Sequence, residues 1–220
     1  MRLFASGSIL SSFVASQMAF SPEPRKYNQL VSMIKAVFPE FDEKTYFNYG
    51  CNGQMNAPEV ANPLAHSGFG APVDELDKIF KEYRACGKCL REEIGEDCLA
   101  DNTRYNWSLS EEGELVSANP VGTCRRNVFE CDKRLAIRLA QGGTAIYDVK
   151  YDFFFTTIGF DFKDDFWCHP SDEVIEAREP ACCQPESKDT AFMRYNKLAK
   201  QCCADGSIQK TCPEGENISY

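Results

Sequence analysis

Three residues beside cysteines have side chains of the types that do chemistry: Tyr83 and Arg84 stand just before Cys86, and Asp132 follows Cys131. A tyrosine phenol has an unperturbed pKa of about 10, so at neutral pH it does not take a proton from water as a histidine can. An arginine carries a fixed positive charge and no lone pair, so it repels Ca²⁺. We therefore predict neither general-base catalysis nor metal binding at Tyr83 and Arg84.

The other groups able to act as bases or metal ligands have simpler explanations. His66 and His169 are the only histidines. Either could supply a base, but a surface or packing role is more common for such a histidine. The spacing of Cys86 and Cys89 would also suit zinc, whereas disulfides are the usual state of cysteines in a secreted chain. The sequence thus predicts no metal and no other cofactor.

Composition and the N-terminal residues indicate a secreted protein. The chain of 220 residues has 12 cysteines, an even number that suggests disulfides. A charged start followed by the short apolar run of Leu3 to Ser16 predicts a signal peptide over residues 1–20. Asn106 and Asn217 each begin a glycosylation sequon. No later stretch has the ~20 apolar residues of a membrane span, so no transmembrane segment is expected.

The net charge restricts the partners. The formal charge of -9 repels nucleic acid and anionic lipid, so neither is an expected target. The mature chain of about 200 residues is long enough to bury a sizeable core.

Helices are predicted to position these groups. Three stretches have apolar side chains at helical spacing, the pattern of a helix with one face on the core: residues 23–37, 74–94 and 125–141. Asp74 is placed to cap the second helix, and Gly142 and Gly143 to end the third. Between them, Tyr105 to Leu109 alternates aromatic and polar residues and predicts one arm of a small hairpin. The insertion from Gln54 to Phe69 contains prolines and glycines and predicts a surface loop.

The composition changes at residue 147, where we place the start of a C-terminal extension, residues 147–220. Its first part, Tyr147 to Phe162, is rich in aromatic and β-branched residues and predicts one or two strands. Six cysteines, all expected in disulfides, follow: Cys168, Cys182, Cys183, Cys202, Cys203 and Cys212. Residues 192–202 have apolar side chains at helical spacing, so we predict a helix there in preference to a hairpin.

Four stretches in the first two thirds of the chain form a recognisable series: Asn28 to Pro39, Tyr49-Gly50-Cys51, Asp77-Lys-Ile-Phe-Lys-Glu-Tyr-Arg-Ala-Cys86 and Cys124-Arg-Arg-Asn-Val-Phe-Glu-Cys131-Asp132. Over residues 26–145 the chain thereby resembles the secreted phospholipase A2 family. That family has an amphipathic N-terminal helix ending near a proline, a Tyr-Gly-Cys calcium loop, and two helices that carry its catalytic residues and several cysteines.

The resemblance implies a degenerate active site. Tyr83 stands where the family has its histidine base, and Arg84 stands where it has a calcium-binding aspartate. Asp132 would orient the histidine of an active enzyme, and here we expect it to pair with Arg84 or to accept a hydrogen bond from Tyr83. The remnant of the calcium loop is Tyr49, Gly50 and Gly53. Ca²⁺ is possible there, but Arg84 disfavours it.

The resemblance also implies a fold, which is mainly α and disulfide-rich. A three-helix core with a small β-wing occupies residues 21–146, and the cysteine-rich extension follows it. Two disulfides are expected by the same resemblance: Cys86 with Cys131, and Cys98 with Cys124. Cys89 competes for Cys98, and Cys51 should reach toward the C-terminal region.

The tail suggests a type of function. Its doubled cysteines, with Tyr195-Asn196 between them and Ala204-Asp-Gly206 after them, resemble one unit of the galaxin-type repeat of biomineral and extracellular-matrix proteins. We therefore favour a secreted, non-catalytic module that binds an extracellular or matrix protein, or a second copy, in a matrix, granule or coat. One alternative is a lipid or fatty-acid binder that uses the former acyl channel. The other is a calcium-dependent phospholipase A2 with relocated catalytic residues.

Overall fold

The computed structural model describes residues 26–46, 48–53, 70–162, 165–168 and 177–213. The elements follow one another along the chain in this order: α1 Lys26–Val37, α2 Glu43–Tyr46, α3 Glu75–Cys89, the π-helical turn η1 Leu90–Ile94, β1 Ser108–Leu109, β2 Leu115–Val116, α4 Cys124–Gly142, the 3₁₀ turns η2 Gly143–Ile146 and η3 Val149–Tyr151, α5 Asp165–Cys168, β3 Pro180–Cys183, β4 Met193–Asn196, β5 Gln201–Cys202 and β6 Ile208–Gln209. Within this described part, no helix is both long enough and apolar enough to span a membrane.

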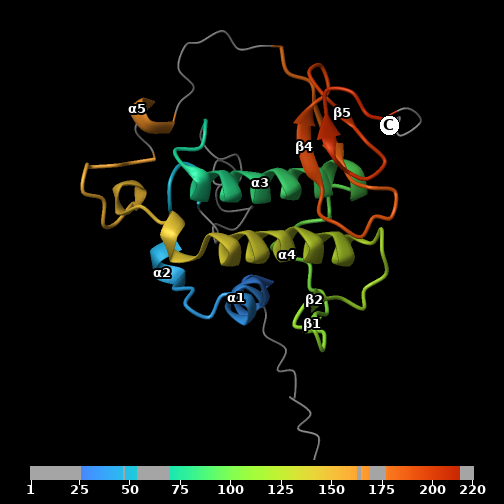
Figure 1. Cartoon of the computed structure of the whole chain (residues 1–220), viewed down its shortest axis with the longest axis horizontal. Coiled ribbons are helices and arrows are strands. Elements are labelled where there is room, and N and C mark those ends of the chain that lie inside the picture. The colour runs from blue at the N-terminus through green and yellow to red at the C-terminus, as the bar shows by residue number, and fades with distance from the viewer. Residues whose placement is uncertain (1–25, 47, 54–69, 163–164, 169–176, 214–220) are drawn as a thin grey trace, which may run out of the picture.

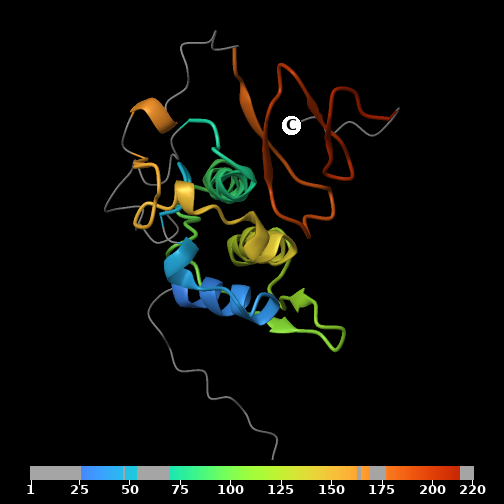
Figure 2. The ribbon, with the colours of Figure 1, turned by 60° about the vertical axis from the view of Figure 1, so that its left-hand side comes forward.

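Three helices, α1, α3 and α4, form the main body. α3 and α4 run side by side in opposite directions, and α1 crosses α4 on the side away from α3 (Figures 1 and 2). The first helix is described from Lys26. The second helix is α-helical to Cys89, and the π-helical turn continues it to Ile94. These are the three stretches in which the hydrophobic spacing predicts helices.

The ends of α3 and α4 follow from local chemistry. The side chain of Asp74 accepts a hydrogen bond from the backbone N of Asp77 (2.8 Å) and so caps the start of α3. Thr123 caps α4 in the same way by accepting from Arg126 N (3.3 Å). α4 ends at Gly142, and Gly143 then has φ +55°, a conformation that glycine adopts without strain.

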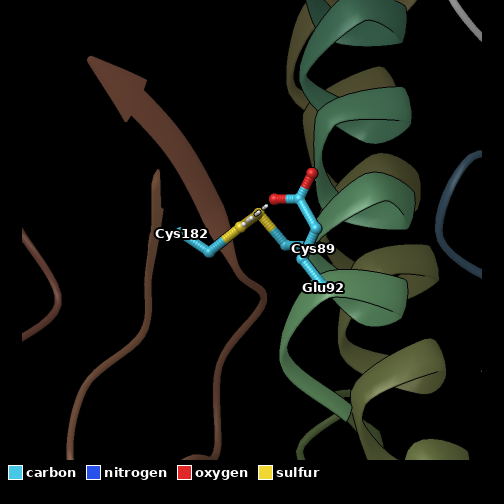
Figure 3. Close-up of side chains that lie close together, drawn as sticks. All are labelled: Cys89, Glu92 and Cys182. Carbon is cyan, nitrogen blue, oxygen red and sulfur yellow. Dashed lines mark hydrogen bonds between the residues drawn. A yellow bond between two sulfur atoms is a disulfide. The ribbon is translucent and has the colours of Figure 1, made fainter. Parts of the chain in front are cut away.

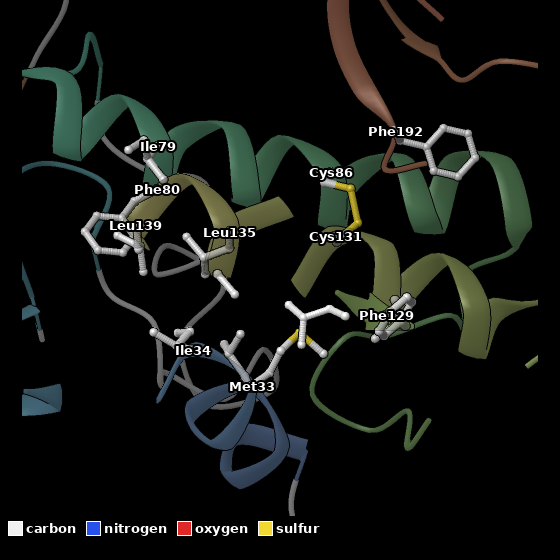
Figure 4. Close-up of a cluster of buried hydrophobic side chains, with 14 of the residues drawn as sticks. Met33, Ile34, Ile79, Phe80, Cys86, Phe129, Cys131, Leu135, Leu139 and Phe192 are labelled. Atoms are coloured by element: carbon white, nitrogen blue, oxygen red, sulfur yellow. A yellow bond between two sulfur atoms is a disulfide. The ribbon is translucent and has the colours of Figure 1, made fainter. Parts of the chain in front are cut away.

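The hydrophobic core lies between the three helices. Met33 and Ile34 of α1 point toward α4, and Ile79 and Phe80 of α3 meet Leu135 and other α4 residues from the opposite side (Figure 4). All five side chains are buried. Burying a side chain of this size stabilises the fold by about 1.5–3 kcal/mol, so this core holds the helices that position the site.

All twelve cysteines form six disulfides: Cys51–Cys168, Cys86–Cys131, Cys89–Cys182, Cys98–Cys124, Cys183–Cys202 and Cys203–Cys212. Both pairs implied by the resemblance are present. Cys89 does not compete for Cys98 but joins the end of α3 to the tail. Cys51 also reaches the tail, through Cys168. Two bonds therefore connect Cys168 and Cys182, which follow α4, to Cys51 and Cys89, which precede it.

Residues 147–162 form no strand, so the prediction for this stretch was wrong. The buried carboxylate of Asp152 accepts hydrogen bonds from Phe154 N and Phe155 N (both 2.7 Å) and from the hydroxyl of Tyr147 (2.8 Å). Thr156 Oγ1 accepts from two further backbone N–H groups. These side chains occupy backbone donors that a β-ladder would need, so the aromatic run folds into turns.

Residues 192–202 contain β4, a turn and β5, so the predicted helix was wrong as well. β4 pairs antiparallel with β3, with Cys182 opposite Arg194. Successive residues of a strand point to opposite faces, so Cys182 faces α3 and bonds Cys89, while Cys183 faces away and bonds Cys202. The apolar spacing seen in the sequence is thus satisfied by a crosslinked hairpin and not by a helix.

Candidate functional site

A buried carboxylate, Asp77 of α3, holds the segment Tyr49–Gly53 in place. It accepts hydrogen bonds from Cys51 N (3.1 Å), Asn52 N (2.7 Å), Asn52 Nδ2 (3.1 Å) and Val73 N (3.0 Å). Asp77 is 0% exposed. Burial raises the pKa of Asp77, and the four donors act against that rise.

The close contact between this segment and α3 requires glycine at two positions. A Cβ atom on Gly50, which has φ +59°, would lie 2.5 Å from Cγ of Asp77. A Cβ atom on Gly53 would lie 2.1 Å from the carbonyl oxygen of Tyr49, to which Gly53 N donates a hydrogen bond (2.7 Å). A side chain at Gly50 would push the segment off α3, and a side chain at Gly53 would break the turn between Tyr49 and Gly53.

Tyr49 links the same segment to the residues that follow α4. Its hydroxyl donates to Asp74 and accepts a hydrogen bond from Asp148 N (3.1 Å). Burial raises the pKa of Tyr49, and the bond to Asp74 raises it further. Gly50 N donates to the carbonyl oxygen of Tyr151 (2.9 Å). The segment is therefore bound by α3 on one side and by the residues that follow α4 on the other.

Arg84 lies five residues before Cys89, the last residue of α3, and its side chain contacts this segment. Its Nε donates to the carbonyl oxygen of Asn52. The side chain is partly buried, and burial lowers the pKa of Arg84 to about 10. That pKa is still far above neutral pH, so Arg84 places a positive charge against the backbone of the segment.

Asp132 of α4 accepts hydrogen bonds from two phenols. Tyr83 donates to Oδ1 (2.9 Å) and Tyr105 donates to Oδ2 (2.5 Å), and Asp132 is 0% exposed. Of the two partners predicted for Asp132, the structure gives it Tyr83. Burial raises the pKa of Tyr83 well above 10, and the charge of Asp132 raises it further. At neutral pH Tyr83 is a hydrogen-bond donor and not a base.

Comparison with known proteins decides the family. No family model matches the chain. A basic phospholipase A2 of Trimeresurus gracilis is 31% identical over 125 residues, which are 56% of this chain and 78% of the relative. The basic phospholipase A2 homolog zhaoermiatoxin of Protobothrops mangshanensis is 30% identical over 128 residues, 56% of this chain and 89% of the relative. The chain belongs to the phospholipase A2 family.

The relatives of this chain are named both basic and acidic. An acidic phospholipase A2 of Naja sagittifera is 26% identical over 119 residues, 54% of this chain and 83% of the relative. With a formal charge of -9, the present chain is on the acidic side. The aligned parts leave more than 40% of the chain without a counterpart in these relatives.

The geometry around Arg84 does not fit a calcium ion. Ca²⁺ is bound by six to eight oxygen ligands, and in this segment the carbonyl oxygen of Asn52 already accepts a hydrogen bond from a guanidinium. The carboxylate of Asp77 faces four N–H donors. A cation beside Asn52 would also be repelled by the charge of Arg84.

Several residues singled out in the sequence lie outside the described residues: His66, His169, Asn217, the whole of residues 54–69 and residues 1–20, for which a signal peptide is predicted. Asn106 is described and exposed, in the chain just before β1. Of the predicted site, the structure brings Tyr83 and Asp132 together, and it places Arg84 Nε on the carbonyl oxygen of Asn52 in the segment Tyr49–Gly53.

Tyr105 and Asn52 are site residues that the sequence reasoning missed. Tyr105 was predicted as part of a hairpin arm, but β1 begins only at Ser108, and the Tyr105 hydroxyl is buried against Asp132. The signal available was the aromatic residue itself, because a buried tyrosine needs a polar partner for its hydroxyl. No local sequence pattern indicates that the carbonyl oxygen of Asn52 accepts a hydrogen bond from Arg84.

Cys89, Glu92 and Cys182 lie close together at the end of α3 (Figure 3). Their ligand atoms are near enough to suggest a metal site, but the two sulfur atoms are joined in a disulfide. A zinc ligand is a thiolate, so this group does not bind zinc while the bond is intact. The carboxylate of Glu92 instead accepts a hydrogen bond from Arg194 (2.6 Å).

The buried phenols predict a loss of stability at alkaline pH. Tyr83 has a folded pKa raised above its unfolded value of about 10, so its contribution is present below pH 10 and is lost as the pH rises further. Between pH 10 and pH 11 the free energy of unfolding should fall by about 1 kcal/mol more in the wild type than in Tyr83→Phe. Guanidinium unfolding at both pH values measures this difference, with Tyr195→Phe as the matched control. Equal slopes for wild type and Tyr83→Phe would contradict a stabilising hydrogen bond between Tyr83 and Asp132.

Proposed function

We propose that this protein is a secreted, non-catalytic member of the phospholipase A2 family that acts by binding an extracellular or matrix protein, or a second copy of itself. The observation that carries the proposal is the state of Tyr83 and Arg84. These residues stand where the family resemblance places the base and the metal ligand. Each is bonded to another part of the protein, Tyr83 to Asp132 and Arg84 to Asn52.

The cysteines support an extracellular site of action. All twelve are paired, and six disulfides persist only in an oxidising compartment. An exposed Asn106 within its sequon leaves room for a glycan.

The tail supports a binding role. Residues 147–220, proposed as an extension to a phospholipase A2-like domain of residues 21–146, are crosslinked to the main body by Cys51–Cys168 and Cys89–Cys182. Two more bonds crosslink the tail internally, through Cys183–Cys202 and Cys203–Cys212. A rigid surface loses little conformational entropy when it binds a partner. The galaxin-like order of cysteines and the chain's acidic charge suit a matrix, granule or coat.

The lipid-binding alternative has less support. Between α3 and α4, beside Tyr83, there is a crevice of about 10 Å³, which holds about one water molecule and not an acyl chain. A larger open hollow of about 570 Å³ is lined in part by the carboxylates of Asp74, Glu75 and Asp148, which do not suit an apolar chain.

Catalytic silence is the first test. The purified full chain should release no fatty acid from mixed phospholipid micelles above buffer, with or without Ca²⁺, because a general base and a Lewis-acid metal are both missing. A general base alone contributes roughly 10²–10⁴-fold. The double variant Tyr83→His with Arg84→Asp should recover at most traces of fatty-acid release. Calcium-dependent hydrolysis by the wild type that stops on adding chelator would show relocated chemistry instead.

Capture from the native extracellular fraction with the tagged full chain is the second test. We expect the tagged chain to retain either another protein in a stoichiometric amount or the untagged chain itself. Recovery of phospholipid or fatty acid without any protein would favour the lipid-binding alternative.

A further inference from the structure

Three phenylalanine side chains of the C-terminal extension are largely exposed to solvent. Phe154, Phe155 and Phe166 expose 57%, 65% and 80% of their surface, and Val149 and Ile158 in the same stretch are exposed as well. We call these five residues the phenylalanine patch. Its segments lie beside the start of α3 and the end of α4, whereas β3 and β4 lie near the other end of α3 (Figures 1 and 2).

The exposed rings are attached to one buried cluster. The ring of Phe154 contacts that of Phe153 (5.1 Å between centroids), and the ring of Phe166 contacts that of Trp167 (5.0 Å). Phe153 and Trp167 both pack against the same group of buried side chains: Cys51, Phe160, Phe162 and Cys168. The exposed rings therefore extend a single apolar cluster to the surface and belong to one face of the molecule.

The backbone that carries these rings is held in place. The buried carboxylate of Asp152 accepts hydrogen bonds from the backbone N of Phe154 and of Phe155 (both 2.7 Å). The disulfide of Cys168 anchors α5, which carries Phe166. A phenylalanine has only two side-chain torsions, so rings on an ordered backbone lose little conformational entropy when a partner covers them. The patch is thus suited to binding without rearrangement.

The exposed area of the patch matches the apolar part of a standard interface. A phenylalanine side chain buries roughly 200 Å² when it is fully covered, so the three rings leave about 400 Å² in solvent. Val149 and Ile158 add to this area. A standard interface buries about 800 Å² of each partner, and a little over half of that surface is apolar. The patch therefore supplies about as much apolar surface as one partner needs.

The charges around the patch favour a second copy of this chain as the partner. Lys150 is paired with Asp148 (2.9 Å), Asp152 is buried and Asp161 is partly buried. With a formal charge of -9, two copies repel each other where their acidic surfaces meet, so they approach most easily at an apolar face. A two-fold interface brings the same surface of both copies together, and an apolar surface is complementary to itself. A basic partner would instead be attracted to the acidic remainder of the surface.

We propose that the phenylalanine patch is the interface of a two-fold dimer of this chain, in which the second copy covers Phe155 and Phe166. The inference rests on the proposed function, because a second copy is one of the partners proposed there, and it names the surface that such a copy would bind. The dimer makes no use of Tyr83, Arg84 or Asp132.

Sedimentation equilibrium of the purified full chain measures this association, with the six disulfides verified by peptide mapping without reduction. We expect a monomer–dimer equilibrium with a dissociation constant in the micromolar range or tighter. Phe155→Ser and Phe166→Ser, each made alone, should weaken dimerisation at least about tenfold, because each removes a covered ring from both halves of a two-fold interface. The two substitutions lie in separate segments, so a folding defect in one variant leaves the other as a test.

A matched variant controls for the loss of exposed apolar side chains in general. Leu109→Ser with Val121→Ser removes two such side chains from β1 and from the residues before α4, and it should change the dissociation constant less than about twofold. The inference is overturned if the wild type stays monomeric at about 100 µM, if the patch variants dimerise as well as the wild type, or if the control weakens dimerisation as much as they do.

Two further outcomes separate this inference from the alternatives. Binding of a monomeric wild type to phosphatidylcholine vesicles, lost in Phe155→Ser, would assign the patch to a lipid surface and overturn the dimer. A monomer that still retains another protein in the capture experiment would overturn the dimer and leave the proposed function standing. A dimer that hydrolyses phospholipid would support the interface and contradict the proposed function alone.

Discussion

Replacing Asp77 with alanine should lower the free energy of unfolding by about 4 kcal/mol. The carboxylate is fully buried and is the shared acceptor for four N–H groups from Cys51, Asn52 and Val73. Without it these donors have neither their protein partner nor access to bulk water, and each buried donor left unsatisfied costs about 1–3 kcal/mol. The segment Tyr49–Gly53 should then detach from α3, which would partly relieve the cost. Chemical unfolding with the disulfides intact measures the change.

Two further variants separate this role from a simple loss of charge. Asp97→Ala removes an exposed carboxylate and should change the free energy of unfolding by less than about 0.5 kcal/mol. Asp77→Asn keeps one acceptor oxygen but turns an amide donor toward N–H groups, so its effect should lie between the other two. A loss of under about 1 kcal/mol for Asp77→Ala would mean that the segment is held by other contacts.

Removing the Cys51–Cys168 disulfide, by Cys51→Ser with Cys168→Ser, should cost about 4 kcal/mol. The bond closes 117 residues of sequence, whereas Cys203–Cys212 closes 9. In the chain-entropy account the longer loop restricts the unfolded chain more, so removal of Cys203–Cys212 should cost only about 2–3 kcal/mol. Cys51 and Cys168 also belong to a second apolar cluster with Phe160 and Phe162, which should loosen with the bond.

Thermal unfolding of the two double-serine variants compares these costs directly. The Cys51–Cys168 variant should melt at a lower temperature than the Cys203–Cys212 variant, and hydrogen exchange should show faster exchange at Phe160 in the first variant alone. An equal effect of the two removals would indicate that the remaining crosslinks, and not the length of the closed loop, determine the stability.

The helices and their ends could be predicted from the sequence because they depend on neighbours along the chain. Apolar residues repeat every three or four positions in α1, α3 and α4, and Asp74 can cap a helix only from the position just before it. The pairing of Tyr83 with Asp132 was among the predicted alternatives, because the resemblance to phospholipase A2 implied that Cys86 and Cys131 join facing helices.

The remaining features depend on residues far apart in the sequence. Residues 147–162 look like strands, yet the side chains of Asp152 and Thr156 accept hydrogen bonds from backbone donors of the same stretch, and Tyr49 forms a β-bridge with Asp152. The tail looks helical, but the disulfide between Cys182 and Cys89 fixes a hairpin on α3. Arg84 binds the carbonyl of Asn52 because a segment 32 residues earlier folds over its helix. The spacing of apolar residues along the chain determines whether a stretch forms a helix or a strand. The partner of a buried polar group is determined only when distant segments pack together, and this packing places Tyr83 on Asp132 and Arg84 on Asn52.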